Sequence, residues 1–275
     1  MRHAPWLHHF KSMRIALALE YDGSRFLGWQ TQPGGGTVQD ALEAALAAIA
    51  GERVDVTCAG RTDRGVHALE QVVHFDVAAR RPESAWVRGV NALLPESVAV
   101  QWSREVPAEF HARYAGHART YRYVLINRAV RPALAAHYAG WFPLPLEVAA
   151  MRTAARHFVG EHDFSAFRSA ECQAKTPVRT LLGLDIESRG ERIDFVVRAN
   201  AFLHHMVRNI VGTLVYVGKG RYPPAWAGEV LDSRDRARAA PTFAAAGLYL
   251  ERVAYESHWG LPLQERPELR IPVLP

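Results

Sequence analysis

The sequence is short of cysteine and lysine and has no long apolar run, and these shortages exclude several classes of protein. It holds only 2 cysteines in 275 residues, Cys58 and Cys172, too few for a disulfide framework or a cysteine-based zinc site. No apolar stretch approaches the length that crosses a bilayer, and the first residues lack the apolar core of a secretory signal. We therefore expect a cytoplasmic protein with free thiols and no membrane association.

Nucleotide-binding and metal-binding motifs are missing as well. The chain has neither the glycine-rich fingerprint of dinucleotide-binding folds nor a P-loop, and the glycines at 34–36 lack the lysine and the spacing of a phosphate cradle. His67 and His74 have no carboxylate or cysteine partner at ligand spacing, which favours structural roles for both. The sequence thus predicts chemistry that uses no metal and no cofactor.

What the chain does have is arginine. Lysine and arginine together number 33 against 28 acidic residues, for a formal net charge of +5, and only Lys11, Lys175 and Lys219 are lysines. Arginine contacts phosphates in bidentate geometry and stacks on bases, so this charge permits a nucleic-acid partner. Coding bias in a GC-rich genome is the simpler explanation of the ratio, so the positions of the arginines matter more than their number.

Apolar periodicity and helix-capping signals predict two similar halves. Alternation from Ile15 to Tyr21 predicts a strand, and Thr37 with Asp40 resembles a capping box before a helix that ends at Gly51. Further strands are expected on both sides of residues 59–68 and over 98–106, 119–127, 178–187, 192–199 and 247–255, and further helices over 84–94, 146–159 and 202–217. The order in the first half is β-α-β-β-α-β, that of a ferredoxin-like unit, and the second half is similar.

This order predicts an α+β fold of two ferredoxin-like (RRM-like) halves, residues 13–115 and 116–256. Side by side they would form one long mixed, mostly antiparallel sheet with helices on one face, which leaves the other face as a groove. Residues 1–12 would be a disordered extension, and residues 257–275 a tail that contains several prolines.

The segment 59–68, AGRTDRGVHA, is the most informative stretch of the chain. It places Asp63 between Arg61 and Arg64, and nearby positive charge favours the ionised carboxylate. Its two glycines permit a sharp turn and a close approach to a ligand. An ordinary turn with solvated charges, or a salt bridge from Arg61 that holds the loop, would explain the same residues without any function.

This decapeptide closely resembles the active-site motif of the tRNA pseudouridine synthase A family. Further blocks match the family in the same order: 110–114 (FHARY), 119–123 (RTYRY), 163–168 (DFSAFR), 200–209 (NAFLHHMVRN) and 247–250 (GLYL). The resemblance covers about residues 13–255. It implies an enzyme that isomerises uridine to pseudouridine at positions 38, 39 and 40 of the tRNA anticodon stem-loop. Its active site would lie in the cleft between the halves, and it would act as a homodimer on tRNA.

The resemblance also implies roles for single residues. Asp63 would be the one catalytic carboxylate, either attacking the sugar or removing a proton, and the sequence does not choose between these roles. Arg61 would help to flip the target base, because a stacked base must leave the helix to react. Arg208, paired with Asp63, would contact the substrate together with Tyr121 and Leu248. The expected tRNA contacts are Arg81, Phe110, His111, Ala112, Arg113, Tyr114, Arg168, Glu171, Cys172 and Lys175.

Other interpretations stay open on the residues alone. Tyr121 is explained slightly better as a core residue, and His204 and His205 have no independent role. An RNA-binding module without chemistry is possible, although the aromatic pairs of ribonucleoprotein motifs are missing. A glycoside or nucleoside hydrolase is the third candidate, but such enzymes usually need two carboxylates and the motif offers one.

Overall fold

The computed structural model describes residues 12–262, and a ten-stranded sheet dominates it. Nearly all of the expected N-terminal extension and most of the expected tail therefore lie outside the described residues. Within the described range, no helix is long and apolar enough to span a membrane.

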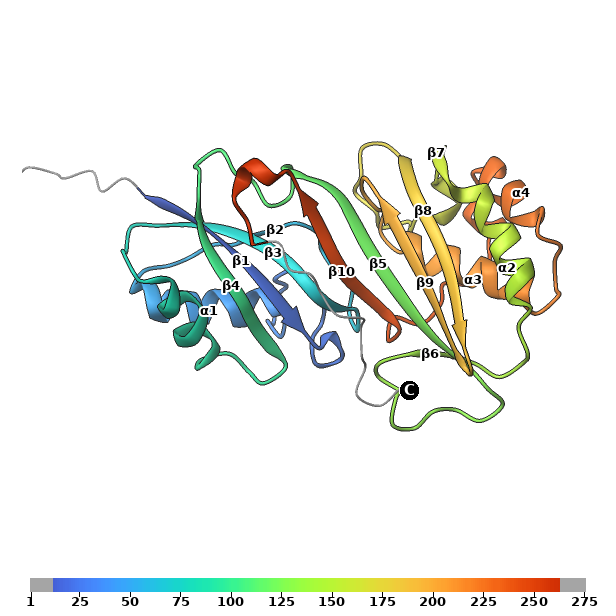
Figure 1. Ribbon diagram of the computed structural model, residues 1–275, viewed down its shortest axis with the longest axis horizontal. Helices are drawn as coiled ribbons and strands as arrows, with labels where there is room; N and C mark the ends of the chain where they lie inside the picture. Colours follow the sequence, from blue (N-terminus) through green and yellow to red (C-terminus); the bar gives the residue numbers. More distant parts are fainter. Residues whose placement is uncertain (1–11, 263–275) are drawn as a thin grey trace, which may run out of the picture.

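The sheet runs the length of the molecule (Figure 1). Its strand order is β4-β1-β3-β10-β5-β9-β8-β7, with β2 paired to β3 and β6 paired to β5. The strands are β1 (Met13–Tyr21), β2 (Thr57–Cys58), β3 (His67–Val77), β4 (Val98–Val106), β5 (Gly116–Asn127), β6 (Gly140–Phe142), β7 (Gly160–Asp163), β8 (Val178–Arg189), β9 (Arg192–Ala199) and β10 (Leu248–Tyr255).

Two halves of the same strand order meet in the middle of this sheet. The N-terminal half has the order β4-β1-β3-β2 and the C-terminal half the order β10-β5-β9-β8, so each has the arrangement of a split βαβ unit. The halves are joined by a parallel pairing of β3 and β10, in which Tyr249 lies opposite His67. The predicted α+β class, with two ferredoxin-like halves in one mixed sheet, is confirmed.

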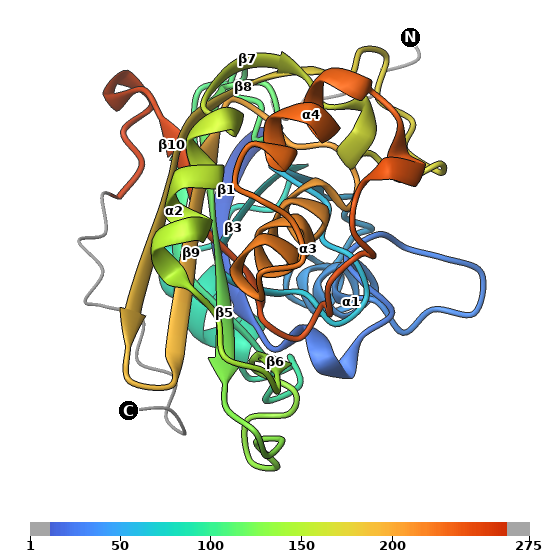
Figure 2. The same cartoon turned by 90° about the vertical axis from the view of Figure 1, so that its right-hand side faces the viewer.

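The four longer helices lie on one side of the sheet, as Figure 2 shows. They are α1 (Val38–Ala50), α2 (Val148–Ala155), α3 (Met206–Gly218) and α4 (Trp226–Ser233). The predicted capping box of α1 is present, since Thr37 and Asp40 each accept the other's backbone N–H, and Gly51 ends the helix in a left-handed conformation at φ 75°. The start and the end of α1 could be predicted from the sequence because capping interactions act within a few residues.

Three predictions about helices were inaccurate. The expected helix over 84–94 contains the π-helical segment Ala85–Gly89, and the expected start at residue 202 moves to Met206, because His205 adopts a left-handed conformation. Helix α4 was not predicted at all. Residues of the expected tail also form structure: a 3₁₀ turn at Ser257–Trp259 brings the Trp259 ring within 5.3 Å of the Phe110 ring centroid.

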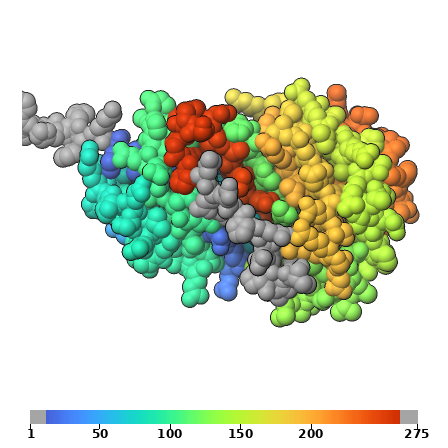
Figure 3. All heavy atoms as spheres, viewed as in Figure 1, coloured from blue at the N-terminus to red at the C-terminus, as the bar shows by residue number. Residues whose placement is uncertain are grey.

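The core lies between the sheet and the helices. Leu42 and Leu46 of α1 and Leu214 of α3 are completely buried. Strand β1 lies between β4 and β3, and its residues 15 to 19 are buried whichever face they point to. Figure 3 shows the opposite face, with the N-terminal half at one end of an elongated molecule and β8 and β9 at the other.

Candidate active site

The loop at residues 59–66 is held tightly against the segment that follows β1. The Tyr21 hydroxyl lies 2.8 Å from the Thr62 hydroxyl, and the Trp29 N–H donates to the Thr62 carbonyl at 3.0 Å. A Cβ at Gly23 would lie only 1.9 Å from the Val66 carbonyl oxygen, so this close approach requires glycine. These contacts fix the backbone on both sides of Asp63 and so determine where its side chain points.

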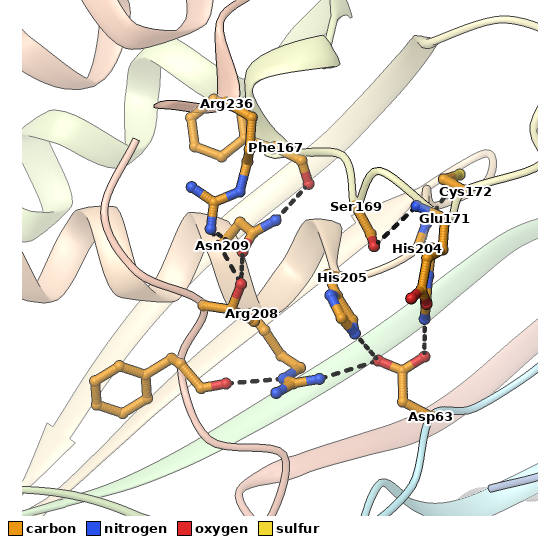
Figure 4. Close-up of polar contacts among 12 residues, drawn as sticks. Asp63, Phe167, Ser169, Glu171, Cys172, His204, His205, Arg208, Asn209 and Arg236 are labelled. Atoms are coloured by element: carbon orange, nitrogen blue, oxygen red, sulfur yellow. Dashed lines mark hydrogen bonds and ion pairs between the residues drawn. The ribbon is translucent and has the colours of Figure 1, made fainter. Parts of the chain in front are cut away.

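The Asp63 carboxylate faces the start of α3 and meets three side chains there (Figure 4). His204 Nε2 lies 3.0 Å from Oδ1, while His205 Nε2 and Arg208 Nη1 lie 3.4 and 3.2 Å from Oδ2. The Asp63 side chain remains 21% exposed, so a ligand can reach it. We call Asp63, His204, His205 and Arg208 the Asp63 cluster. It lies on the side of the sheet that carries the helices.

The surroundings of this carboxylate favour negative charge. The first turn of α3 offers the positive end of a helix dipole, and Arg208 adds a full positive charge. The Arg208 Nε donates to the Phe243 carbonyl at 2.8 Å, which orients the guanidinium toward Asp63. Burial lowers the pKa of His205, against the opposing effect of Asp63. The arrangement holds the carboxylate in a defined position.

The cation that pairs with Asp63 is not one of its sequence neighbours. Arg61 and Arg64 are exposed, and among residues 12–262 neither forms an ion pair with Asp63. Neither neighbour therefore pairs with Asp63, because the loop turns both side chains to solvent. The Arg208 pair expected from the resemblance is present, across 145 positions of sequence.

Tyr121 of β5 and Leu248 of β10 are buried residues of the sheet itself. Tyr121 is 8% exposed and packs edge-on against Phe202 at 5.0 Å. A Cβ at Gly60 would lie 3.8 Å from its hydroxyl, so the ring borders the loop that carries Asp63. Burial, and then the charge of Asp63, raise the pKa of Tyr121. Leu248 is buried at the start of β10, opposite Tyr123 of β5.

The expected tRNA contacts between β4 and β5 divide into buried and exposed residues. Phe110 and Ala112 are completely buried, so their side chains pack inside the segment, and their contact with tRNA stays a prediction. Tyr114 is 76% exposed, and its ring centroid lies 4.3 Å from that of His111 and 5.8 Å from the Arg113 guanidinium. An exposed aromatic ring beside a cation suits an unpaired base.

A second group of expected contacts reaches the Asp63 cluster. The Cys172 thiol is buried and accepts the His204 N–H at 3.5 Å, and the Arg168 guanidinium donates to the Cys172 carbonyl. Glu171 and Lys175 are exposed on the same loop. This loop, residues 168–175, therefore joins an accessible surface to the backbone beside Asp63.

Arg81 is remote from Asp63. It follows the C-terminal end of β3, whereas the Asp63 loop precedes the N-terminal end, and an 11-residue strand is roughly 35 Å long. Its Nε donates to the Ile49 carbonyl at 3.1 Å, and with Trp86 it lines a cavity of about 210 Å³. Any contact of Arg81 with tRNA is thus separate from the candidate active site.

The imidazoles and the carboxylate of the Asp63 cluster could also hold a metal ion. Their ligand atoms lie within 4.8 Å of one another, and His/His/Asp sets suit zinc. A bound metal would compete for the carboxylate with the guanidinium already paired to it. His67 and His74 are not in this cluster: each is buried and accepts a backbone N–H through Nδ1.

Sequence comparison agrees with this site. The family model described as tRNA pseudouridine synthase matches residues 17–115 and 154–256. A protein of Dechloromonas aromatica named tRNA pseudouridine synthase A is 56% identical over 250 residues, 91% of this chain and 95% of the relative. Proteins of the same name from Burkholderia thailandensis and Methylobacillus flagellatus are 58% and 55% identical, over 91% and 92% of this chain and 93% and 97% of those relatives.

The chain therefore belongs to the tRNA pseudouridine synthase family. The family expected from the decapeptide and the later blocks is confirmed, and with it the class of enzyme, an isomerase that acts on uridine in tRNA.

Proposed function

We propose that this chain isomerises uridine to pseudouridine at positions 38, 39 and 40 of the tRNA anticodon stem-loop, with Asp63 as its only catalytic residue. Family membership supports the reaction. The observation that carries the assignment to Asp63 is its contact with three side chains, a hydrogen bond from Arg208 and the close approach of two imidazoles, which surround both of its oxygens in a partly open position.

The reaction suits a site with one carboxylate. The bond between uracil N1 and the sugar carbon breaks, the uracil turns within the site, and its C5 bonds to the same carbon. C5 loses a proton and N1 gains one, so no electron donor or acceptor is needed. Asp63 either bonds transiently to the sugar carbon or removes a proton, and both roles require an ionised, oriented carboxylate.

Three further residues would handle the target nucleotide. Arg61 is exposed on the same loop as Asp63, where its side chain can enter the stack that the flipped base leaves. Tyr121 borders the loop from the sheet side and would contact the uracil or ribose. Leu248 would provide an apolar wall of the pocket.

The tRNA would be held by exposed groups at two places, the His111–Arg113–Tyr114 surface and the loop 168–175. We infer a homodimer from the family resemblance, with one tRNA contacting both subunits. Light scattering during size-exclusion chromatography tests this, and a fully active monomer would contradict it. We place the enzyme in the cytoplasm, where tRNA is modified.

The assignment is tested with Asp63→Asn and Asp63→Ala. Uridines tritiated at C5 release tritium as pseudouridine forms, so both variants should release none while still binding tRNA in a gel-shift assay. Asp55→Asn is the matched control, because Asp55 is an exposed acid paired only with exposed Arg53. Turnover by Asp63→Asn would refute the assignment, and release of free uracil by the native enzyme would instead indicate a hydrolase.

A further inference from the structure

Two consecutive histidines hold the two oxygens of Asp63 separately. His204 contacts Oδ1 at 3.0 Å and His205 contacts Oδ2 at 3.4 Å, each through Nε2 (Figure 4). A carboxylate only accepts hydrogen bonds, so a ring at this distance can hold it only with a proton on Nε2. Arg208 reaches Oδ2 alone, and by itself it would leave the carboxylate free to rotate about its Cβ–Cγ bond. His204 supplies the contact that opposes this rotation.

The backbone is strained at the point where this arrangement requires it. Adjacent residues in a helix or a strand point in different directions, so they rarely reach the same group. His205 has φ 65° and ψ 1°, a left-handed conformation that costs a non-glycine residue about 1 kcal/mol or more. Among the described residues, Arg234 is the only other non-glycine residue with positive φ. The consequence at His205 is that both rings face Asp63, with their centroids 4.1 Å apart.

The histidine pair is also held independently of Asp63. The His204 N–H donates to the Cys172 thiol, and the His204 carbonyl accepts the Ser169 N–H at 3.0 Å. The His205 carbonyl accepts the Asn209 N–H at 2.9 Å, within the first turn of α3. The rings are therefore anchored by the loop 168–175 on one side and by α3 on the other, so they can orient the carboxylate rather than follow it.

We propose that His204 and His205 are positioning residues, which donate Nε2–H to the two oxygens of Asp63 and fix the orientation in which it reacts. This inference rests on the proposed function, because it assumes that Asp63 reacts. His205 is the third residue of a turn closed by the Met206 N–H and the Leu203 carbonyl at 3.1 Å, and its left-handed conformation sets the direction of both rings.

Substitutions separate this role from a structural one. His204→Ala and His205→Gly should each lower kcat for tritium release by about 10- to 100-fold with little change in KM, because a misplaced reacting group loses rate rather than affinity. His204→Gln and His205→Gln should recover most of the rate, since the glutamine amide nitrogen can take the place of Nε2–H. His205→Gly also relieves the backbone strain, which offsets part of the stability lost with the imidazole contact.

His117→Ala is the matched control: His117 is a half-exposed histidine 3.7 Å from Glu256, away from Asp63, and its loss should change neither constant. Unchanged kcat in both His204→Ala and His205→Gly would overturn the proposal, and so would a higher KM at constant kcat, which would make the histidines RNA contacts. Equal loss in the alanine, glycine and glutamine variants would also overturn it. Activity of Asp63→Asn would instead overturn the proposed function, whatever the histidine variants show.

Discussion

Removal of the Asp63 carboxylate should destabilise the protein as well as inactivate it. In Asp63→Ala, the Arg208 guanidinium and the rings of His204 and His205 lose their shared acceptor. These side chains are only 15%, 33% and 27% exposed, so water replaces the lost contacts incompletely. A hydrogen bond to a charged group contributes about 1.5–3 kcal/mol, and partial exposure reduces that contribution. We expect a net loss of about 1–2 kcal/mol in the free energy of unfolding.

The loss is measurable by thermal unfolding. For a chain of this size, 1 kcal/mol lowers Tm by about 2–4 °C, so Asp63→Ala should melt roughly 2–8 °C below the native protein in a circular dichroism scan. Asp55→Ala is the control, because its ion pair with Arg53 is exposed and should leave Tm unchanged. Many catalytic groups are strained and their removal stabilises the fold. A higher Tm for Asp63→Ala would refute our inference that the contacts within the Asp63 cluster stabilise the fold.

Two further predictions concern protons and metal ions. Burial lowers the pKa of His74 to about 4, so between pH 6.5 and pH 4 the unfolded chain binds a proton that the folded chain does not, and stability should fall as the pH decreases through this window. Urea unfolding at several pH values should show a flatter dependence for His74→Asn, and an identical dependence would contradict the assignment. Added Zn²⁺ should slow tritium release by binding the imidazoles and carboxylate of the Asp63 cluster, and EDTA should reverse this. EDTA alone should leave the rate unchanged, and inactivation by EDTA would contradict a cofactor-free reaction.

The features predicted correctly from sequence are those whose causes are local. The Thr37–Asp40 capping box and the Gly51 helix end act within single turns, so their residues are sufficient to locate them. The order of strands and helices predicted two ferredoxin-like halves, because apolar periodicity reports which faces are buried. The family, too, was recognisable from blocks of consecutive residues.

The set of residues that forms the candidate site could not be predicted in the same way, because it depends on contacts between distant segments. Sequence neighbours suggested that Arg61 and Arg64 would hold Asp63, yet both are exposed, and the carboxylate turns to the start of α3. His204 and His205 lay in a block that matches the family, but no role could be assigned to them from the sequence, since their joint approach to Asp63 depends on one left-handed backbone conformation. A reader of the sequence could have suspected them only from their spacing to Arg208.

The sequence by itself determined most of the elements, their order and the presence of an acid in a glycine-flanked loop, because these follow from short-range sterics and burial. The tertiary structure decided which groups surround that acid, which expected tRNA contacts are buried, and that Arg81 lies at the far end of β3. The pairing of β3 with β10 joins the two halves, and the packing of α3 brings residues about 140 positions apart to one carboxylate. Only the folded chain brings such distant groups into contact.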